Sequence, residues 1–262
     1  MRLELAIEIS AKLVAVLAMI QSLEFLATRA SWGTSGAWRF DDLKQEWGSS
    51  LLEKLLWVFL NQNSFFILQI LRIGLASFVF YRIHWVALLG LFLMHFLTLL
   101  RFRGSYNGGS DYMNLLVLIC LTVTVAFREI KLVPWVAFGY LAIQLILSYS
   151  KAGWMKLRIK SWRTTLALES FLRSSSYSES FWVDRLLQSK KLLLGSSWAI
   201  LGFELLFPLS ILHPKLALGF MTVGFCFHLA NAYVFGLNRF ILSWLAAYPA
   251  LYFMANHFNF FK

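Results

Sequence analysis

The sequence predicts an all-α protein, a polytopic membrane bundle of about eight transmembrane helices with further helices lying in the membrane interface. Of its 262 residues, 59% are hydrophobic and only 14% are charged, whereas soluble domains have about 25% charged residues. Several apolar stretches approach the roughly 20 residues that cross a bilayer as a helix. These stretches are continuously apolar and lack the alternation of barrel strands, so helices are expected to pair the backbone groups in lipid.

The first apolar stretch covers residues 13–28 and is read as a membrane helix of the mature protein. Lys12 and Arg29 flank it and can extend their charged ends toward the headgroups. The later stretch 51–60 is too short to span and carries two charged residues near its start. It is therefore expected to be an amphipathic helix in the interface.

Seven further spans are expected along the chain. They cover residues 64–80, 85–100, 112–127, 132–149, 192–212, 216–236 and 240–254. Asn107, Gly108 and Gly109 predict a tight turn before the span at 112, and Asp111 is placed to cap that helix. We expect one integral membrane domain over residues 1–262, and no internal repeat of the kind found in inverted-repeat transporters is evident.

Residues 151–191 form the longest polar segment of the second half of the chain. Two short apolar stretches interrupt it, at 166–172 and 181–187. Both are expected to be helices in the interface, with aromatic side chains at headgroup depth. The segment is therefore interpreted as interfacial helices and not as a flexible linker.

The net charge of +11 and the pI of about 9.8 would be compatible with nucleic-acid binding in a soluble protein. Here the basic residues are spread among loops and no recognition motif is present, so no nucleic acid is expected as a partner. Basic loops beside anionic lipid headgroups explain the charge, and membrane lipids are the expected partners. Cys120 and Cys226 both lie in apolar stretches without a CxxC motif, which favours buried thiols over redox chemistry.

Ionisable residues inside expected spans are costly and indicate either function or an interhelical contact. Five residues are of this kind: Glu24, Arg72, His95, Glu204 and His228. For Glu24 and Arg72, an ion pair or hydrogen bond that holds the bundle together is the favoured reading. The other three are candidates for a site.

His228 and Asn231 are three residues apart and share one helical face. Glu204 lies four residues before Pro208, which removes the hydrogen bond to the Glu204 carbonyl and leaves a polar position at depth. His95 and His228 could be paired haem ligands, although two lone histidines are a weak signal. Multi-histidine boxes, HExxH, GxSxG and P-loop motifs are absent, and no metal site is expected.

Lys156 follows the apolar stretch 132–149 and lies near Gly153 and two tryptophans. Burial disfavours the charged form of a lysine, so a lysine at a dry interface can act as a general base. The alternative is that Lys156 is one of several cations facing lipid phosphates. The residues alone leave both readings open.

Four segments in the same order resemble the HTTM family, which includes the transmembrane domain of vitamin K-dependent gamma-carboxylase and its short bacterial relatives. They are residues 149–157 (YSKAGWMKL) followed by Trp162, 103–111 (RGSYNGGSD), 203–208 (FELLFP) and 228–240 (HLANAYVFGLNRF). Together they cover most of the chain from about residue 85 onwards.

The resemblance implies a membrane enzyme that uses a quinol-like, lipid-soluble cofactor, with Lys156 as the base and a histidine assisting. We expect Lys156, His228 and Glu204 to be catalytic. Substrate or cofactor binding is expected at Asn107, Asp111, Trp162, Asn231 and His95. Short bacterial relatives include maturation proteins for secreted peptides, so a peptide substrate or a partner membrane protein is also implied, as is location in the bacterial inner membrane.

Two departures from the family pattern are evident. Thr165 stands where the family has a glycine. The 262 residues also contain no counterpart of the large soluble domain that engages the substrate peptide in the carboxylase, which counts against glutamate carboxylation itself. A non-catalytic accessory role in peptide maturation or complex assembly, or a small transporter, are the alternative functions.

Overall fold

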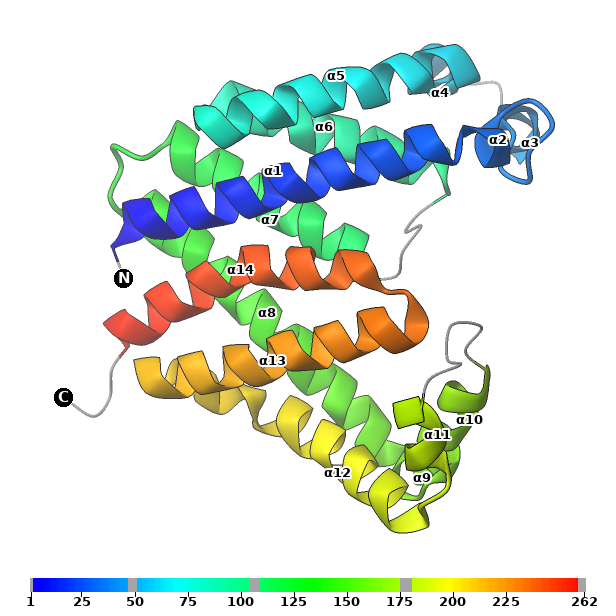
Figure 1. The fold of residues 1–262 in the computed structure, drawn as a ribbon. Helices are drawn as coiled ribbons and strands as arrows, with labels where there is room; N and C mark the ends of the chain where they lie inside the picture. Colours follow the sequence, from blue (N-terminus) through cyan, green and yellow to red (C-terminus); the bar gives the residue numbers. More distant parts are fainter. Residues whose placement is uncertain (1, 47–50, 104–108, 175–180, 259–262) are drawn as a thin grey trace. The chain divides into compact units, whose positions relative to one another are not determined.

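The computed structural model describes residues 2–46, 51–103, 109–174 and 181–258. Over these residues the secondary structure is entirely helical, without a strand. Figure 1 traces the helices in chain order. The packing divides into two compact units: the N-terminal unit, residues 7–137, and the C-terminal unit, residues 1–6 with 138–262.

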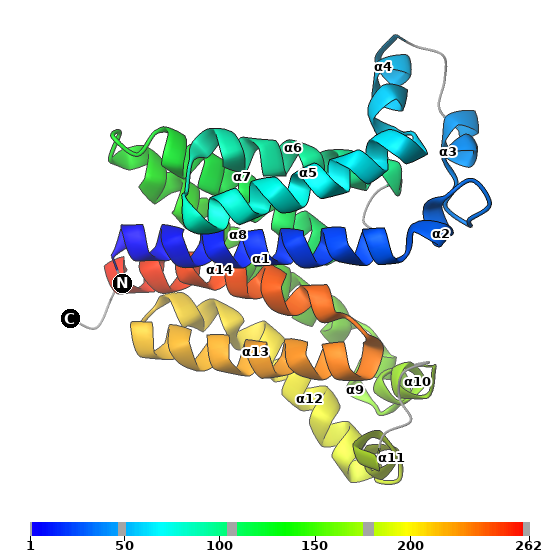
Figure 2. The same ribbon diagram turned by 45° about the horizontal axis from the view of Figure 1, so that its top comes forward.

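The N-terminal unit contains most of α1 and the six helices that follow it. Their bounds are α1 Leu3–Ala27, α2 Arg29–Trp32, α3 Phe40–Glu46, α4 Leu51–Leu60, α5 Gln62–Tyr81, α6 Trp85–Arg101 and α7 Gly109–Ala126. Helix α6 packs against both α5 and α7, and Figure 2 shows these three helices side by side. A cluster of buried apolar side chains fills one end of this unit, and its members are Phe25, Trp32, Phe65, Leu68 and Phe102.

A buried polar network links four helices of the N-terminal unit. Arg72 Nη2 donates to Gln21 Oε1 at 2.7 Å and lies 3.1 Å from His95 Nδ1. His95 Nε2 donates to the backbone carbonyl of Asp111 at 2.8 Å, and Gln21 Nε2 donates to Asp111 Oδ1 at 3.3 Å. These bonds satisfy polar groups that would be costly in an apolar interior. For Arg72 and His95, the structure therefore favours the role of joining helices.

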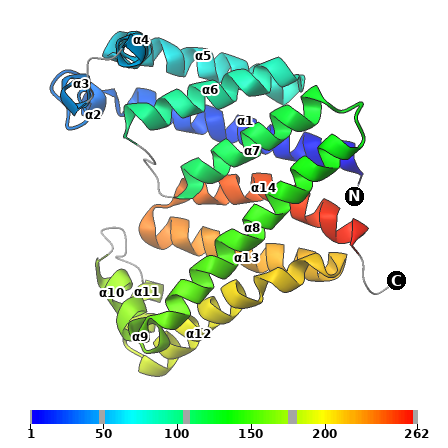
Figure 3. The same ribbon diagram turned by 180° about the vertical axis from the view of Figure 1, so that it is seen from behind.

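The C-terminal unit contains most of α8 and the helices that follow it. Their bounds are α8 Leu132–Arg158, α9 Lys160–Arg163, α10 Leu166–Ser174, α11 Phe181–Leu187, α12 Lys190–Leu206, η1 Phe207–Ile211, α13 Pro214–Phe235 and α14 Asn238–His257. Helix α13 packs along α14, and the short helices α9, α10 and α11 contact α12. Figure 3 shows α8 and α12 approaching each other near these short helices.

Local sequence explains where several of these helices end. Pro208 lacks the backbone N–H that α12 would need, and the chain changes to the 3₁₀ helix η1 at this point. Helix α13 ends at Gly236, whose φ of 67° is left-handed and favours glycine. The end of α13 and the following turn hold residues of α13 and α14 at the mouth of the cavity described below.

The all-α prediction is confirmed for the described residues. Seven of the eight expected spans fall within one helix, to within a residue at their ends, and the stretch 192–212 is shared by α12 and η1. Within the described ranges, five helical segments are long and apolar enough to cross a membrane, namely α5, α7, α8, α12 with η1, and α13. Of the other three, α6 is a shorter apolar helix of 17 residues, and α1 and α14 have 25 and 20 residues. The protein therefore has the composition and helices of an integral membrane protein, while eight spans stay a prediction.

Two expectations about particular segments have clear outcomes. The stretches predicted to be short helices at 51–60, 166–172 and 181–187 coincide with α4, α10 and α11. The span expected to end at Tyr149 was placed too short, because α8 continues to Arg158. Residues 150–158 contain no proline, and Met, Lys, Leu and Arg favour helix, so Lys156 lies on a helix and not in a loop.

Candidate functional site: an aromatic cavity around an ion pair

A cavity of about 450 Å³ lies within the C-terminal unit. Residues from α8, α9, α10, α12, α13 and α14 line it, together with Leu237 just before α14. Most of the wall is apolar and much of it is aromatic. The aromatic lining residues are Tyr149, Trp162, Phe171, Phe227, Phe235, Phe240 and Trp244.

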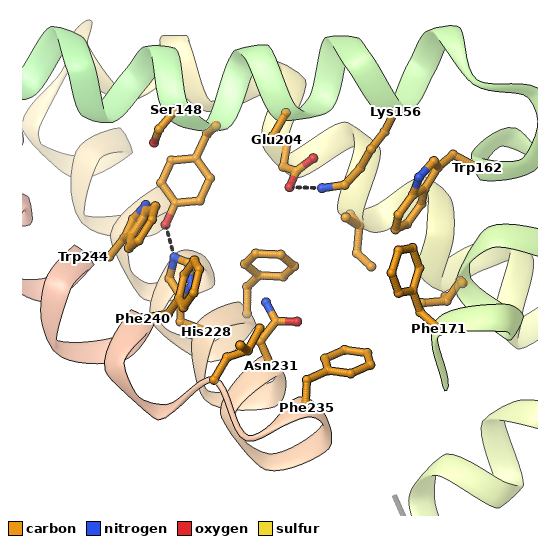
Figure 4. Close-up of a pocket in the computed structure, with 16 residues that line it drawn as sticks. Ser148, Lys156, Trp162, Phe171, Glu204, His228, Asn231, Phe235, Phe240 and Trp244 are labelled. Atoms are coloured by element: carbon orange, nitrogen blue, oxygen red, sulfur yellow. Dashed lines mark hydrogen bonds and ion pairs between the residues drawn. The ribbon is translucent and has the colours of Figure 1, made fainter. Parts of the chain in front are cut away.

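Lys156 and Glu204 form an ion pair at the wall of this cavity (Figure 4). Lys156 lies in the last turns of α8 and Glu204 in the last turn of α12. The Glu204 side chain is only 3% exposed and that of Lys156 is 21% exposed. A carboxylate so deeply buried requires a nearby cation, and Lys156 supplies it.

Gly153 explains why the two helices approach closely enough for this pair. A Cβ atom at Gly153 would lie 2.8 Å from Glu204 Cβ and 2.9 Å from the Leu205 backbone nitrogen. Both distances are shorter than real Cβ contacts permit, so only glycine fits here. Because Gly153 lies one turn before Lys156, this contact brings the lysine beside the carboxylate.

Trp162 holds the other side of the Lys156 ammonium group. Lys156 Nζ lies 5.2 Å from the centre of the Trp162 ring, within the range of a cation–π interaction. The Ser197 hydroxyl donates to the Trp162 backbone carbonyl, which ties α9 to α12. The Trp162 ring also lies 5.7 Å from that of Phe171 on α10. The short helices after α8 therefore complete one wall of the cavity, as Figure 4 shows.

A chain of hydrogen-bonding side chains lies at the other side of the cavity. His228 Nε2 and the Tyr149 hydroxyl are 2.7 Å apart, and that hydroxyl is 2.9 Å from the Tyr248 hydroxyl. Trp244 and Phe240 flank the imidazole, with ring centres 4.8 Å and 6.0 Å from it. The ring of His228 is thus fixed in position between α8 and α14.

Three buried polar atoms of this site have no hydrogen-bond partner among the described residues. They are Glu204 Oε2, His228 Nδ1 and Trp244 Nε1. Buried polar groups normally find partners, and all three residues line the cavity. Asn231, one turn after His228 on α13, adds an amide that can both donate and accept. The cavity therefore combines a large apolar wall with a few polar groups, as sites for small organic ligands do.

The structure brings together five of the eight residues predicted for the site. Lys156, Glu204, His228, Asn231 and Trp162 all line this one cavity. They come from segments up to 75 residues apart in the chain, which the spacing alone does not reveal.

The three other predicted residues do not line the cavity. His95 and Asp111 belong to the N-terminal unit, where they take part in the network with Gln21 and Arg72. Both nitrogens of the His95 ring are engaged there, so neither is available to a haem iron. Asn107 lies outside the described residues. Among those residues no group of three or more His, Cys, Asp or Glu side chains could hold a metal ion.

The two tyrosines that are hydrogen-bonded in series from His228 were not predicted to have a role. Tyr149 begins the segment that contains Lys156, and a polar aromatic residue seven positions before it lies on the same face of a helix. That spacing was a signal that could have identified it. Tyr248 carried no such signal, because it contacts Tyr149 across 99 residues of sequence.

No family model, no curated protein and no solved structure matches the chain.

Proposed function

We propose that this chain is an integral membrane enzyme of the HTTM type, acting on a lipid-soluble, quinol-like molecule with Lys156 as the base. The observation that carries the proposal is the pair of Lys156 and Glu204 at the wall of a largely aromatic cavity. Three of the four segments that resemble the family contribute Lys156, Glu204, His228 and Asn231 to that cavity. By the same resemblance, the bacterial inner membrane is the proposed location.

The lining residues fit a flat, mostly apolar ligand that carries oxygen atoms at its edges. The cavity volume of about 450 Å³ lies within the usual range for small-molecule sites. Trp162 and Phe171 stand at one side and Phe240 and Trp244 at the other, so a ring system could stack between them. The Asn231 amide and His228 Nδ1 can form hydrogen bonds to ring oxygens.

Lys156 must lose its proton before it can act as a base. Glu204 is the group placed to receive it, since the ammonium donates directly to Glu204 Oε1. Transfer of that proton gives a neutral amine beside a neutral carboxyl group. The amine can then accept a proton from a ligand hydroxyl within reach, and the resulting ammonium stabilises the negative charge left on the oxygen.

A quinol supplies an acidic hydroxyl and two electrons when it is bound. His228 and the Tyr149 hydroxyl, 2.7 Å apart, form a second hydrogen-bonded path at the opposite wall. Through it a proton could move toward Tyr248, which lies beyond the cavity lining. The two polar groups therefore have different roles. Lys156, paired with Glu204, accepts a proton from the ligand, whereas His228 with Tyr149 orients the ligand and moves a proton.

Ligand binding by purified protein in detergent tests this proposal. A short-chain naphthoquinol is titrated onto the wild type and onto Lys156→Met, Ala152→Phe and Lys160→Met. Ala152 lines the cavity, so the phenylalanine should fill it. Lys160 is an exposed lysine of the same segment and serves as the matched control.

The proposal predicts that Ala152→Phe abolishes binding and that Lys160→Met binds like the wild type. Lys156→Met should retain an apolar cavity but lose about tenfold in affinity for the quinol, because one hydrogen bond to the ligand is lost. Equal binding by the wild type and Ala152→Phe, or none by either, would rule out this cavity as the quinol site.

A further inference from the structure

A second, smaller cavity lies in the N-terminal unit and is lined largely by arginine side chains. Its volume is about 270 Å³. The lining residues are Ala37, Trp38, Arg39, Leu43, Arg101 and Arg103, here called the arginine pocket. They come from the segment between α2 and α3, from α3, and from the end of α6.

Arg101 is the buried member of the arginine pocket. Its side chain is 2% exposed, and its Nη2 donates to the Trp32 backbone carbonyl at 3.1 Å. Its Nε has no hydrogen-bond partner among the described residues, and no carboxylate of the described chain forms an ion pair with it. The rings of Phe40, Phe65 and Phe102 lie 5.8 to 5.9 Å from the guanidinium.

Among the residues that the structure describes, no carboxylate balances the charge of Arg101. Aromatic faces attract a cation, but a buried guanidinium usually has a carboxylate or phosphate partner. Since the Arg101 side chain lines the pocket, an anion that binds in the pocket can balance its charge. The aromatic rings fix the guanidinium before the anion arrives.

Arg103 adds a second guanidinium at a backbone position that arginine seldom occupies. Its φ of 59° is left-handed, a conformation that is unfavourable for a residue with a side chain. Arg39 adds a third, and it is exposed apart from its pair with Asp42, 2.7 Å from Nε to Oδ1. Three guanidinium groups therefore line one small pocket, and no acidic residue is among the described residues of its lining.

We propose that the arginine pocket binds a phosphate-bearing anion. The planar guanidinium presents parallel N–H donors that match phosphate oxygens, and several arginines can share one phosphate group. A volume of about 270 Å³ accommodates the phosphate with part of what it carries. The donor is a lipid headgroup or a free phosphate compound, and both would present the same oxygens.

The arginine pocket lies at the ends of apolar helices, a position that suits a site at the depth of the lipid headgroups. Arg101 is in the last turn of α6, and Trp32 and Trp38 lie just beyond the end of α1. Tryptophan and arginine gather at this level of a membrane protein. The arginine pocket shares no residue with the aromatic cavity, so this inference is independent of the proposed quinol chemistry.

Binding measurements on the full chain in neutral detergent test the proposal. Dioleoyl phosphatidic acid is added in one arm and inorganic pyrophosphate in the other, and bound ligand is measured by native mass spectrometry and by the shift in melting temperature. The variants are Arg39→Gln, Arg103→Gln and their double variant. Both residues are exposed, so these changes spare the buried Arg101 and the fold. Arg128→Gln, an exposed arginine of the same unit paired with Glu129, is the matched control.

The wild type and Arg128→Gln should bind at least one of the two ligands with equal affinity. Each single variant should bind about tenfold more weakly, and the double variant more weakly still. Binding of phosphatidic acid alone assigns the pocket to a lipid headgroup, and binding of pyrophosphate assigns it to a free phosphate compound. Absence of binding in both arms, or equal binding by the double variant and Arg128→Gln, would overturn the proposal.

Discussion

Lys156 and Glu204 form one ion pair, but they are buried to different extents. The lysine side chain is about one-fifth exposed, whereas the glutamate is almost completely buried. Removing one member of a buried ion pair leaves the charge of the other member buried without an opposite charge, and this destabilises the folded protein. The consequence therefore depends on which member is removed.

Lys156→Met should destabilise the protein by about 3 kcal/mol, because it leaves the buried Glu204 carboxylate without its cation. Glu204→Gln should cost only about 1 kcal/mol, since the amide can still accept a hydrogen bond and the lysine can reach water. Melting temperatures of the two variants in the same detergent show which substitution destabilises the protein more. A larger loss for Glu204→Gln would contradict the burial that the structure assigns to the pair.

At the residue scale the sequence singled out several residues that line the cavity, but it did not reveal which residues they contact. Lys156 could be singled out from Gly153, the nearby tryptophans and the family-like segment around it. Its pairing with Glu204 could not, because the two residues are 48 positions apart and meet only through the packing of α8 on α12. The contacts of His95 with Arg72 and Asp111 could not be predicted for the same reason, since no local pattern shows which residues of other helices it meets.

Helices α8 and α12 are the elements that build the site, and Gly153 sets the distance between them. Gly153→Ala should destabilise the protein by about 1–3 kcal/mol, because the methyl group meets the backbone and Cβ of α12 at less than 3 Å. That loss exceeds the gain of up to about 1 kcal/mol in helix propensity. The variant should also weaken quinol binding, since the Lys156–Glu204 pair would be pushed apart.

Gly195→Ala is the matched control on α12. Nothing lies within 4 Å of the added methyl group, so only the gain in helix propensity remains and stability should stay equal or rise. Thermal unfolding of both variants, side by side, measures the difference. If Gly153→Ala and Gly195→Ala changed the melting temperature equally, α8 and α12 would not be in close contact at Gly153.

At this scale the hydrophobic pattern predicted the existence of the helices and missed some of their ends. The short helices α10 and α11 were predicted from a few apolar residues each. The end of α8 was missed because hydropathy falls after Tyr149, whereas helix propensity and the contact at Gly153 carry the helix on to Arg158. An apolar pattern indicates burial or lipid contact, and a helix can continue beyond the residues that are buried or face lipid.

At the scale of the whole molecule, the described chain forms two compact units with different contents. The N-terminal unit holds a polar network and the arginine pocket, and the C-terminal unit holds the aromatic cavity. Composition and apolar stretches were enough to predict a helical membrane protein. They could not predict that five of the residues selected for one site lie together while two lie in another unit, because such grouping depends on tertiary packing.

Cys226 tests whether α13 crosses the membrane. It lies near the middle of this apolar helix and is exposed in the structure, whereas Cys120 is buried. If α13 spans the bilayer, Cys226 faces lipid, and a charged, membrane-impermeant maleimide should not label it in intact or permeabilised membranes. A cysteine placed at the exposed Arg128 should be labelled in permeabilised membranes. Rapid labelling of Cys226 without detergent would contradict the span.

The central claim is that the aromatic cavity around Lys156 and Glu204 binds a quinol-class molecule. Mass spectrometry of the lipids that remain bound to the purified protein tests it most directly, with wild type and Ala152→Phe prepared in parallel from the same host membranes. The account predicts a quinone-class lipid at close to one molecule per protein in the wild type and at least tenfold less in Ala152→Phe. Equal amounts in the two preparations, or no quinone in the wild type, would contradict it.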